Sequence, residues 1–265
     1  MARVSLLIGL LMFGCASESP ASAPTDSGGA DTRTTLDTGT IDTSVGDTTP
    51  STIAANGKVT AMKGKAPLAG VEVCVYQHAE VPCATTNAAG TYFLPGIPAA
   101  VDGSLRFRKT GYLGILAPFR ARTASLDDFE EMMSADDAMA LATAAGASDP
   151  GSATTGTIAM NVFTGPVNTS EKRVAGATIE LQPAVGKGPL YLAADGTVDP
   201  AAKATTAAGM AIFVDVPAGT HVVRITHPTL KCTDHIFIWN GDAETSGRTP
   251  VDASLMSTPT MNCPP

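Results

Sequence analysis

The sequence predicts an all-β protein made of two tandem β-sandwiches, joined by a short helical connector and preceded by a disordered tether. Three observations favour this class. Short segments alternate apolar and polar residues between Gly and Pro turn signals, which is typical of strands in sandwiches or barrels. A pattern in the first half of the chain recurs in the second. Only 5% of the 265 residues are aromatic and 16% charged, against 26 Gly and 19 Pro, which argues against a coiled coil or helical bundle.

The charge balance excludes one class of partner. The chain carries 17 Lys and Arg against 25 Asp and Glu, for a formal net charge of -8. Such a chain repels phosphate backbones, and no basic stripe reverses this locally. Nucleic acid is therefore not an expected partner.

The N-terminus reads as a secretion signal. One base, Arg3, precedes the apolar run Val4–Phe13. As a helix this run rises about 15 Å, too little for a hydrocarbon core of roughly 30 Å, so it is a signal h-region over residues 1–14 and not a membrane span. Cys15 follows Gly14 directly.

This junction resembles the lipobox of bacterial lipoproteins, which implies that Cys15 is lipidated and becomes the first residue of the mature chain. The membrane is then a partner through a lipid anchor. Ala16 and Ser17 include no acidic retention signal, which by analogy favours the outer membrane. The alternative is an ordinary secretory signal with an incidental cysteine.

Residues 15–52 form the next segment, and after Cys15 they are rich in Ser, Thr, Asp, Gly and Pro. With so few apolar side chains, the segment cannot offset a backbone ordering cost of about 1 to 2 kcal/mol per residue. We expect a flexible tether with an r.m.s. span of roughly 30 to 35 Å. Its acids lack the Asp-x-Asp-x-Asp-Gly spacing of a calcium loop.

The first sandwich is predicted over residues 53–122. Val71, Val73 and Val75 fall on one face of a strand, with polar residues and Cys74 between them. Further candidate strands lie at 57–62, 91–94, 104–108 and 112–117.

An internal repeat predicts the second sandwich over residues 153–265. Residues 86–99 align without a gap with residues 205–218, so that Gly90 meets Gly209. Each of these glycines precedes an apolar strand, where a tight turn with positive φ favours Gly. Two upstream segments recur in the same order: 67–73 as 173–179, and 57–59 as 156–158.

These motifs resemble the carboxypeptidase regulatory-like family of transthyretin-like (prealbumin-like) sandwiches. The resemblance rests on Gly-x-Val at 57–59, Pro-Leu-x-Gly-Val-x-Val at 67–73, Thr-x-x-x-Gly-x-Tyr at 86–92 and Gly-Tyr at 111–112. Residues 55–121 match closely and residues 155–231 more loosely, with Ala211 in place of the tyrosine. The resemblance implies a structural role, because none of these motifs is catalytic.

Residues 123–152 are predicted to be a helical, acidic connector. Ser125 with Asp128 resembles a capping box, and Leu126, Phe129 and Met133 share one helical face. Ser134 predicts the start of a second helix that runs through residue 145. Six acids crowd this segment: Asp127, Asp128, Glu130, Glu131, Asp136 and Asp137. They are interpreted as helix N-terminal charge and solvation, or alternatively as an acidic docking surface or cation site.

Four cysteines remain if Cys15 carries lipid, and two fall in each sandwich: Cys74, Cys83, Cys232 and Cys263. An oxidising compartment favours disulfides. Three connectivities are possible, and pairing within each sandwich needs no approach between them.

No recognised catalytic constellation occurs in the sequence, so we expect a protein that is not an enzyme and has no cofactor. His-x-x-Glu, Gly-x-Ser-x-Gly and phosphate-binding Gly-rich loops are all missing from the sequence. One cluster is a metal alternative: His227, Cys232, Asp234 and His235. A disulfide at Cys232 would remove it, and in a strand Cys232 and His235 face opposite ways.

The leading functional expectation is a non-catalytic lipoprotein that binds or scaffolds at the cell envelope, with an envelope protein or polysaccharide as partner. The alternative is a carbohydrate-binding protein of the cell surface. Sugar sites rely on exposed aromatic rings, and Trp239 is the one tryptophan of the chain. It is either a possible ligand contact or a core residue.

Overall fold

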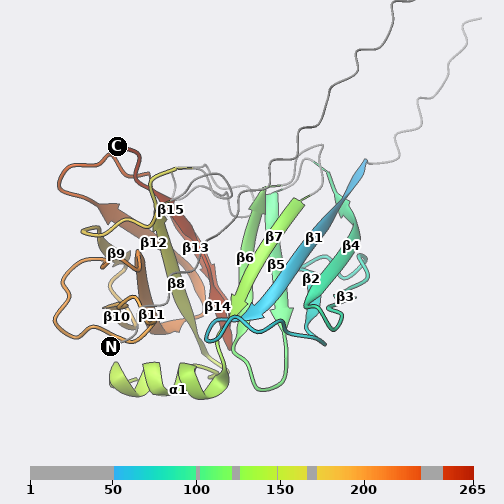
Figure 1. Cartoon of the computed structure of the whole chain (residues 1–265), viewed down its shortest axis with the longest axis horizontal. Coiled ribbons are helices and arrows are strands. Elements are labelled where there is room, and N and C mark those ends of the chain that lie inside the picture. Colours follow the sequence, from blue (N-terminus) through green and yellow to red (C-terminus); the bar gives the residue numbers. More distant parts are fainter. Residues whose placement is uncertain (1–50, 100–101, 121–125, 148, 166–171, 234–246) are drawn as a thin grey trace, which may run out of the picture. The chain divides into compact units, whose positions relative to one another are not determined.

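The computed structural model describes residues 51–99, 102–120, 126–147, 149–165, 172–233 and 247–265. Within these ranges the chain forms strands β1 to β15 and one helix, α1 (Figure 1). The all-β class and the two tandem sandwiches are confirmed. The signal peptide, Cys15 and nearly all of the tether lie outside the described residues, as do Asp234, His235 and Trp239.

The first sandwich stacks a three-stranded sheet on part of a nine-stranded one. In the smaller sheet β1 lies between β4 and β7; the other layer has the order β6-β5-β2-β3. Fully buried residues of both layers, such as Leu94 and Phe107, fill the space between them. The strands are β1 (Thr52–Ala61), β2 (Glu72–Val75), β3 (Ala84–Thr85), β4 (Thr91–Pro98), β5 (Asp102–Arg108), β6 (Gly114–Arg120) and β7 (Leu126–Met132).

Strand β7 corrects the predicted helix at residues 125–133. It pairs in parallel with β1 over seven register positions, from Ala55 with Leu126 to Ala61 with Met132. Phe129, predicted to lie on the helix's apolar face, is 55% exposed, whereas Met132 is fully buried. The ladder with β1 overrides the local helical spacing and capping signal, because strand formation depends on the neighbours available in the fold.

The second sandwich repeats this plan and adds a strand. Strands β8 and β11 form one layer with β10 and β15, and β13-β12-β9 form the other. A separate cluster of buried residues, which includes Ile158, Met160 and Phe213, fills its interior. The bounds are β8 (Thr155–Phe163), β9 (Thr178–Gln182), β10 (Lys187–Tyr191), β11 (Met210–Pro217), β12 (Gly219–Thr226), β13 (Arg248–Val251) and β15 (Thr260–Asn262).

A buried threonine in each sandwich confirms the internal repeat in atomic detail. The Thr86 hydroxyl donates to the carbonyl of Leu68 at 2.6 Å and accepts from the backbone N–H of Val71 at 2.9 Å. The Thr205 hydroxyl donates to the carbonyl of Val174 at 2.7 Å and accepts from the N–H of Ala177 at 2.9 Å. The aligned glycines that follow have positive φ in both copies: Gly90 at 75° and Gly209 at 58°.

The register of the first repeat strand differs from the sequence alignment by four residues. The alignment placed Val59 opposite Ile158, but the hydrogen bonds equate Val59 with Val162. The N–H of Val59 donates to the carbonyl of Gly90, and the N–H of Val162 to that of Gly209, each at 2.8 Å. The short Gly-x-hydrophobic pattern recurs by chance four residues upstream, and only the ladder to the neighbouring strand distinguishes the two registers.

Complementary residue sizes explain why the second copy lacks the tyrosine. In the first sandwich Gly57 pairs with Tyr92, and a Cβ on Gly57 would lie 2.4 Å from the tyrosine ring. The equivalent pair in the second sandwich is Met160 with Ala211, both fully buried. The large side chain of the pair is on the second strand in the first sandwich (Tyr92) and on the first strand in the second sandwich (Met160). Both interiors are therefore filled.

Strand β14 (Leu255–Ser257) joins the two sandwiches. It pairs in parallel with β6 of the first and with β8 of the second, which makes one nine-stranded sheet. Beside it, the Tyr76 hydroxyl donates to Oδ2 of Asp252 at 3.0 Å. Leu116 and Leu255 form a small buried cluster against Tyr76.

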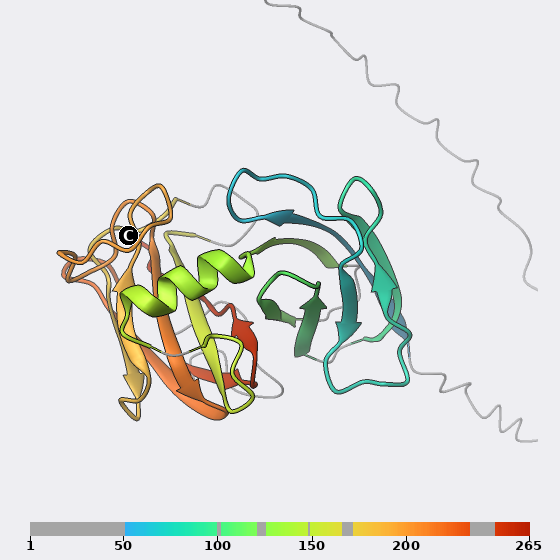
Figure 2. The same ribbon diagram turned by 90° about the horizontal axis from the view of Figure 1, so that it is seen from below.

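Helix α1 (Ala135–Ala144) confirms the second predicted helix. Its N-cap is Ser134, whose hydroxyl accepts from the N–H of Asp137 at 3.1 Å and donates to the carboxylate of Asp137 at 2.7 Å. Leu141 belongs to the same hydrophobic cluster as Ile212 of β11. Figure 2 shows α1 lying across the strands of the second sandwich.

The two phenylalanines of opposite exposure in the first sandwich provide a stability test. Phe107→Ala should lower the free energy of unfolding by about 3 to 5 kcal/mol, because it leaves a cavity in a packed core. Phe93→Ala should change it by no more than about 0.5 kcal/mol, because that ring is exposed. Urea denaturation followed by circular dichroism measures both. Equal losses would contradict the arrangement of β4 and β5.

The Tyr76–Asp252 contact predicts a loss of stability at alkaline pH. Burial, and then the hydrogen bond to Asp252 and its charge, raise the pKa of Tyr76 above the ordinary 10.0. A phenol with a raised folded-state pKa stabilises the fold below the unfolded-state pKa and loses this contribution as pH rises through the folded-state value. Urea denaturation from neutral to strongly alkaline pH should show a smaller alkaline loss in Tyr76→Phe than in the wild type. Tyr112→Phe, which leaves Asp252 bonded to Tyr76, should behave as the wild type does.

Candidate functional site

Both disulfides of the structure lie within one sandwich each. Cys74 bonds to Cys83 and Cys232 bonds to Cys263. Of the three connectivities left open by the sequence, this is the one that needs no bond between sandwiches. Cys263, fully buried, follows β15 and fixes the C-terminal segment to the second sandwich.

Two residues of the candidate metal cluster, Cys232 and His227, are engaged elsewhere in the structure. Cys232 is in a disulfide, so it offers no thiolate. The Nδ1 atom of His227 accepts from the N–H of Thr229 and of Leu230, and its Nε2 atom lies 3.0 Å from the carbonyl of Ala175. Both ring nitrogens are thus used within the fold. The part of the chain that the structure describes contains no group of three or more His, Cys, Asp or Glu side chains arranged to hold a metal ion.

Two predicted site residues lie outside the described residues: Cys15, expected to carry lipid, and Trp239, the possible ligand contact. No helix in the described ranges is long and apolar enough to cross a membrane.

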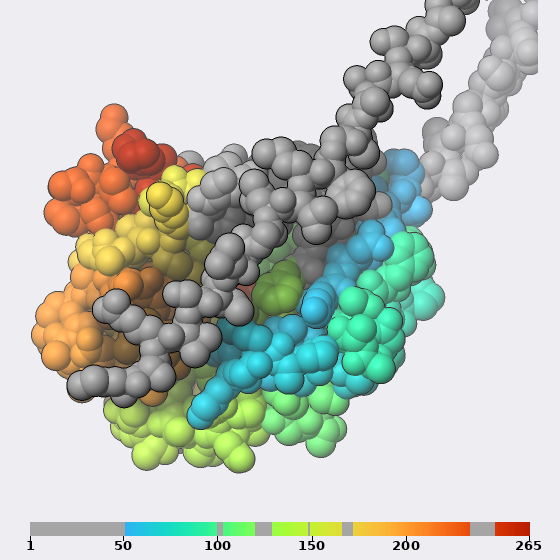
Figure 3. All heavy atoms as spheres, in the orientation of Figure 1, coloured from blue at the N-terminus to red at the C-terminus, as the bar shows by residue number. Residues whose placement is uncertain are grey.

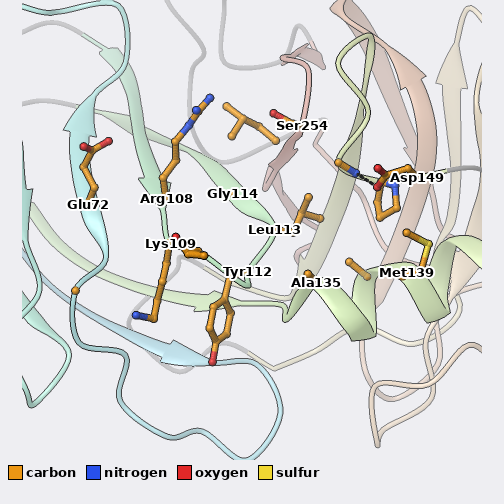
Figure 4. Close-up of a pocket in the computed structure, with 16 residues that line it drawn as sticks. Glu72, Arg108, Lys109, Tyr112, Leu113, Gly114, Ala135, Met139, Asp149 and Ser254 are labelled. Atoms are coloured by element: carbon orange, nitrogen blue, oxygen red, sulfur yellow. Dashed lines mark hydrogen bonds between the residues drawn. The ribbon is translucent and has the colours of Figure 1, made fainter.

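An open pocket of about 560 Å³ lies where β5, β6, α1 and the start of β14 meet. Arg108, Lys109 and Met139 are among the side chains that line it. In Figure 4 the charged ends of Arg108 and Lys109 point away from one another. The Lys109 ammonium donates to the carbonyl of Ala69 at 2.7 Å, and Asp149 accepts from the N–H of Gly151 in its own loop. The charged groups therefore do not converge on one ligand atom.

Shifted pKa values occur at separate positions outside this pocket. Burial raises the pKa of Tyr191. A hydrogen bond from His78 lowers the pKa of Glu80, and the N–H and hydroxyl of Thr197 lower that of Asp195. Each shift has a local structural cause, and no two of these groups form an acid and base pair.

The outer side of the β4-β1-β7 sheet, which we term the open face, is the second candidate surface. We define it by Asn56 and Lys58 on β1, Thr91 and Phe93 on β4, and Phe129 on β7; all five are exposed. Phe93 and Phe129 are 59% and 55% exposed. Atoms of β1 and β4 lie next to one another at the molecular surface in Figure 3.

The strand register places the two rings on either side of β1. Phe93 pairs with Asn56, and Phe129 pairs with Lys58 two residues further along. Strands lie about 4.8 Å apart and rise about 3.3 Å per residue, so the two phenylalanines are roughly 10 Å apart across the sheet and roughly 7 Å apart along it. By this register an amide and an ammonium group lie between two aromatic rings on one face of the sheet.

The sequence contains a signal for half of this face. In the predicted strand 91–94, Tyr92 and Leu94 share one phase and Phe93 has the other, so an inward Tyr92 requires an outward Phe93. The helical spacing of Leu126, Phe129 and Met133 predicts an apolar helical face instead, so the sequence does not indicate that Phe129 shares a sheet face with Phe93.

No family model and no curated protein matches the chain. Solved structures match it with low similarity. The minor pilin of Streptococcus agalactiae is 11% identical and covers 80% of this chain and 95% of its own, with a TM-score of 0.26. The shaft pilin SpaA of Lactobacillus rhamnosus GG is 12% identical over 81% of this chain and 98% of its own, with a TM-score of 0.22.

A type II cohesin–X-dockerin complex from Acetivibrio cellulolyticus contains a chain that is 18% identical, with a TM-score of 0.29. That match spans 38% of this chain and 65% of the other, just under two thirds of its length. These similarities concern the fold alone.

Loop length predicts a different contribution from each disulfide. The cysteines are separated by 9 residues in the first bond and by 31 in the second. Because closing the longer loop removes more entropy from the unfolded chain, the double variant Cys232→Ala/Cys263→Ala should lose about 1 kcal/mol more stability than Cys74→Ala/Cys83→Ala. Urea denaturation of both variants measures this. An equal or larger loss for the shorter loop would contradict it.

Proposed function

We propose that this protein is a non-catalytic lipoprotein of the cell envelope that binds or scaffolds at the cell surface through its two sandwiches. The observation that carries the proposal is the open face. Water contact with apolar surface costs about 25 cal/mol per Å², and two phenylalanine side chains on one sheet face are each more than half exposed. Two exposed aromatic rings on one sheet face, with an amide and an ammonium group between them, support an interaction site there.

The N-terminal sequence supports an envelope location. An apolar run that ends in Gly14-Cys15 fits a lipidated cysteine. The Ser-, Thr- and Asp-rich residues 16–52 would act as the spacer between lipid and sandwiches, with a reach of roughly 30 to 35 Å. A protein held in this way meets its partners at the membrane surface, where an open binding face is useful.

The assignment of both sandwiches to the carboxypeptidase regulatory-like, transthyretin-like class is part of this proposal. The residues that carry the resemblance have defined structural roles: Thr86 holds a loop by two hydrogen bonds, and Gly70 and Gly90 have positive φ. Their equivalents Thr205 and Gly209 do the same in the second copy. Motifs used entirely for backbone geometry support a binding module and not an enzyme.

Replacement of the proposed lipid-bearing residue tests the location. Cys15→Ala should move the protein from the membrane fraction to the soluble fraction, because it removes the atom to which lipid is attached. Cell fractionation with immunoblotting measures the shift, and a density gradient then separates the inner from the outer membrane.

Gly14→Ala is the matched control, because it keeps a small residue before the cysteine; it should remain with the membranes. Retention of Cys15→Ala in the membrane fraction would refute the lipid anchor.

A further inference from the structure

The same face of the sheet is covered in the second sandwich and exposed in the first. By the strand register, Phe93 of β4 is equivalent to Ile212 of β11. Ile212 is fully buried and belongs to one hydrophobic cluster with Leu141 of α1, whereas Phe93 is 59% exposed. Helix α1 covers the face in the second sandwich (Figure 2). No described element covers it in the first.

The residues at equivalent positions show that the open face does not suit a helix. At four equivalent positions the covered face is aliphatic and the open face is polar, proline or aromatic: Ala159 against Asn56, Met210 against Thr91, Ile212 against Phe93 and Val214 against Pro95. The position of Lys58 is polar in both copies, because its equivalent is Asn161. An apolar helix on the open face would bury the Asn56 amide and the Lys58 ammonium without partners, which costs several kcal/mol. The surface instead suits a ligand that offers both apolar area and hydrogen-bonding groups.

A polysaccharide has this combination of groups. One side of a pyranose ring presents C–H groups that stack on an aromatic ring, and hydroxyl groups around its edge donate and accept hydrogen bonds. The open face supplies a ring on each side of β1, with Asn56 and Lys58 between them. Two rings roughly 12 Å apart, from the strand spacing and rise, contact separate units of one chain.

The charge of the open face favours an acidic polysaccharide. The Lys58 ammonium makes no ion pair or hydrogen bond with any described residue. On the same sheet, the carboxylate of Glu131 lies 2.6 Å from the Lys65 ammonium, so its charge is already compensated. Lys58 is therefore the one charged side chain among the five residues that define the open face, and local complementarity to such a charge selects an anionic ligand.

We propose that the open face binds an acidic polysaccharide, whose sugar rings stack on Phe93 and Phe129 and whose carboxylates meet Lys58. This inference rests on the proposed function and gives that function a ligand class.

Calorimetric titration of the full chain in detergent tests it, with polygalacturonate, alginate and hyaluronate as acidic probes and methyl-esterified polygalacturonate as the neutral counterpart. The wild type should bind at least one acidic probe. Phe93→Ala and Phe129→Ala should each weaken that binding about 2- to 12-fold, the range of one aromatic contact. Lys58→Gln should abolish the preference for the acid over its ester, and added salt should weaken binding of the acid by the wild type.

Met139→Ala is the matched control, because it removes an apolar side chain that is 45% exposed on α1; its affinity should equal that of the wild type. Thermal unfolding of every variant should match the wild type, since all four side chains are exposed. The proposal is overturned if no probe binds, if the phenylalanine variants bind like the control, or if acid and ester bind equally.

Sedimentation identifies the competing occupant: a dimer that Phe93→Ala dissociates would assign the face to a second copy of the chain and overturn the proposal. Failure of glycan binding in a protein that Cys15 still anchors would leave the proposed function standing. Failure of the anchor would refute that function whatever the glycan result.

Discussion

The pairing of β14 with strands of both sandwiches is the interaction on which the rest of the structure depends. The strand pairs with β6 at three register positions on one side and with β8 at two on the other. Residues Thr48–Pro265 consequently behave as one compact unit and not as two domains on a linker. The shared sheet also places Asp252 beside Tyr76. The hydrophobic cluster of the first sandwich includes residues of α1, β8 and β11 as well.

The two sandwiches share the same backbone hydrogen bonds and differ in their core side chains and in whether the outer face of the sheet is covered. A threonine hydroxyl holds the same loop in both, and a glycine with positive φ turns the chain into the same strand. Side-chain volume has moved between neighbouring strands, as Gly57 with Tyr92 and Met160 with Ala211 show. Helix α1 covers the outer face of the second sandwich, and the outer face of the first is exposed to solvent. A shared frame with divergent surfaces is the usual way in which sandwich proteins diversify.

Local chemistry made part of this structure predictable. The gapless repeat, the glycine turns and the Ser134 cap each depend on residues close in sequence, and all are present. Strand β7 was missed because Leu126 to Met132 carries helical spacing, while the partner that makes it a strand lies some seventy residues upstream. The four-residue register error and the bridging role of β14 have the same origin, since short apolar segments do not specify their neighbours. The alternation around Phe93 predicts one aromatic residue of the open face, whereas the helical spacing around Phe129 does not predict the other.

The central position of β1 has a mechanical consequence. This strand is the first described element after the N-terminal segment, and it hydrogen-bonds to β4 on one side and β7 on the other. A force applied through the preceding chain therefore acts along β1. Because inter-strand hydrogen bonds run across the strand direction, such a load shears both ladders together instead of opening them one bond at a time. The first sandwich therefore resists a pull on its N-terminal end.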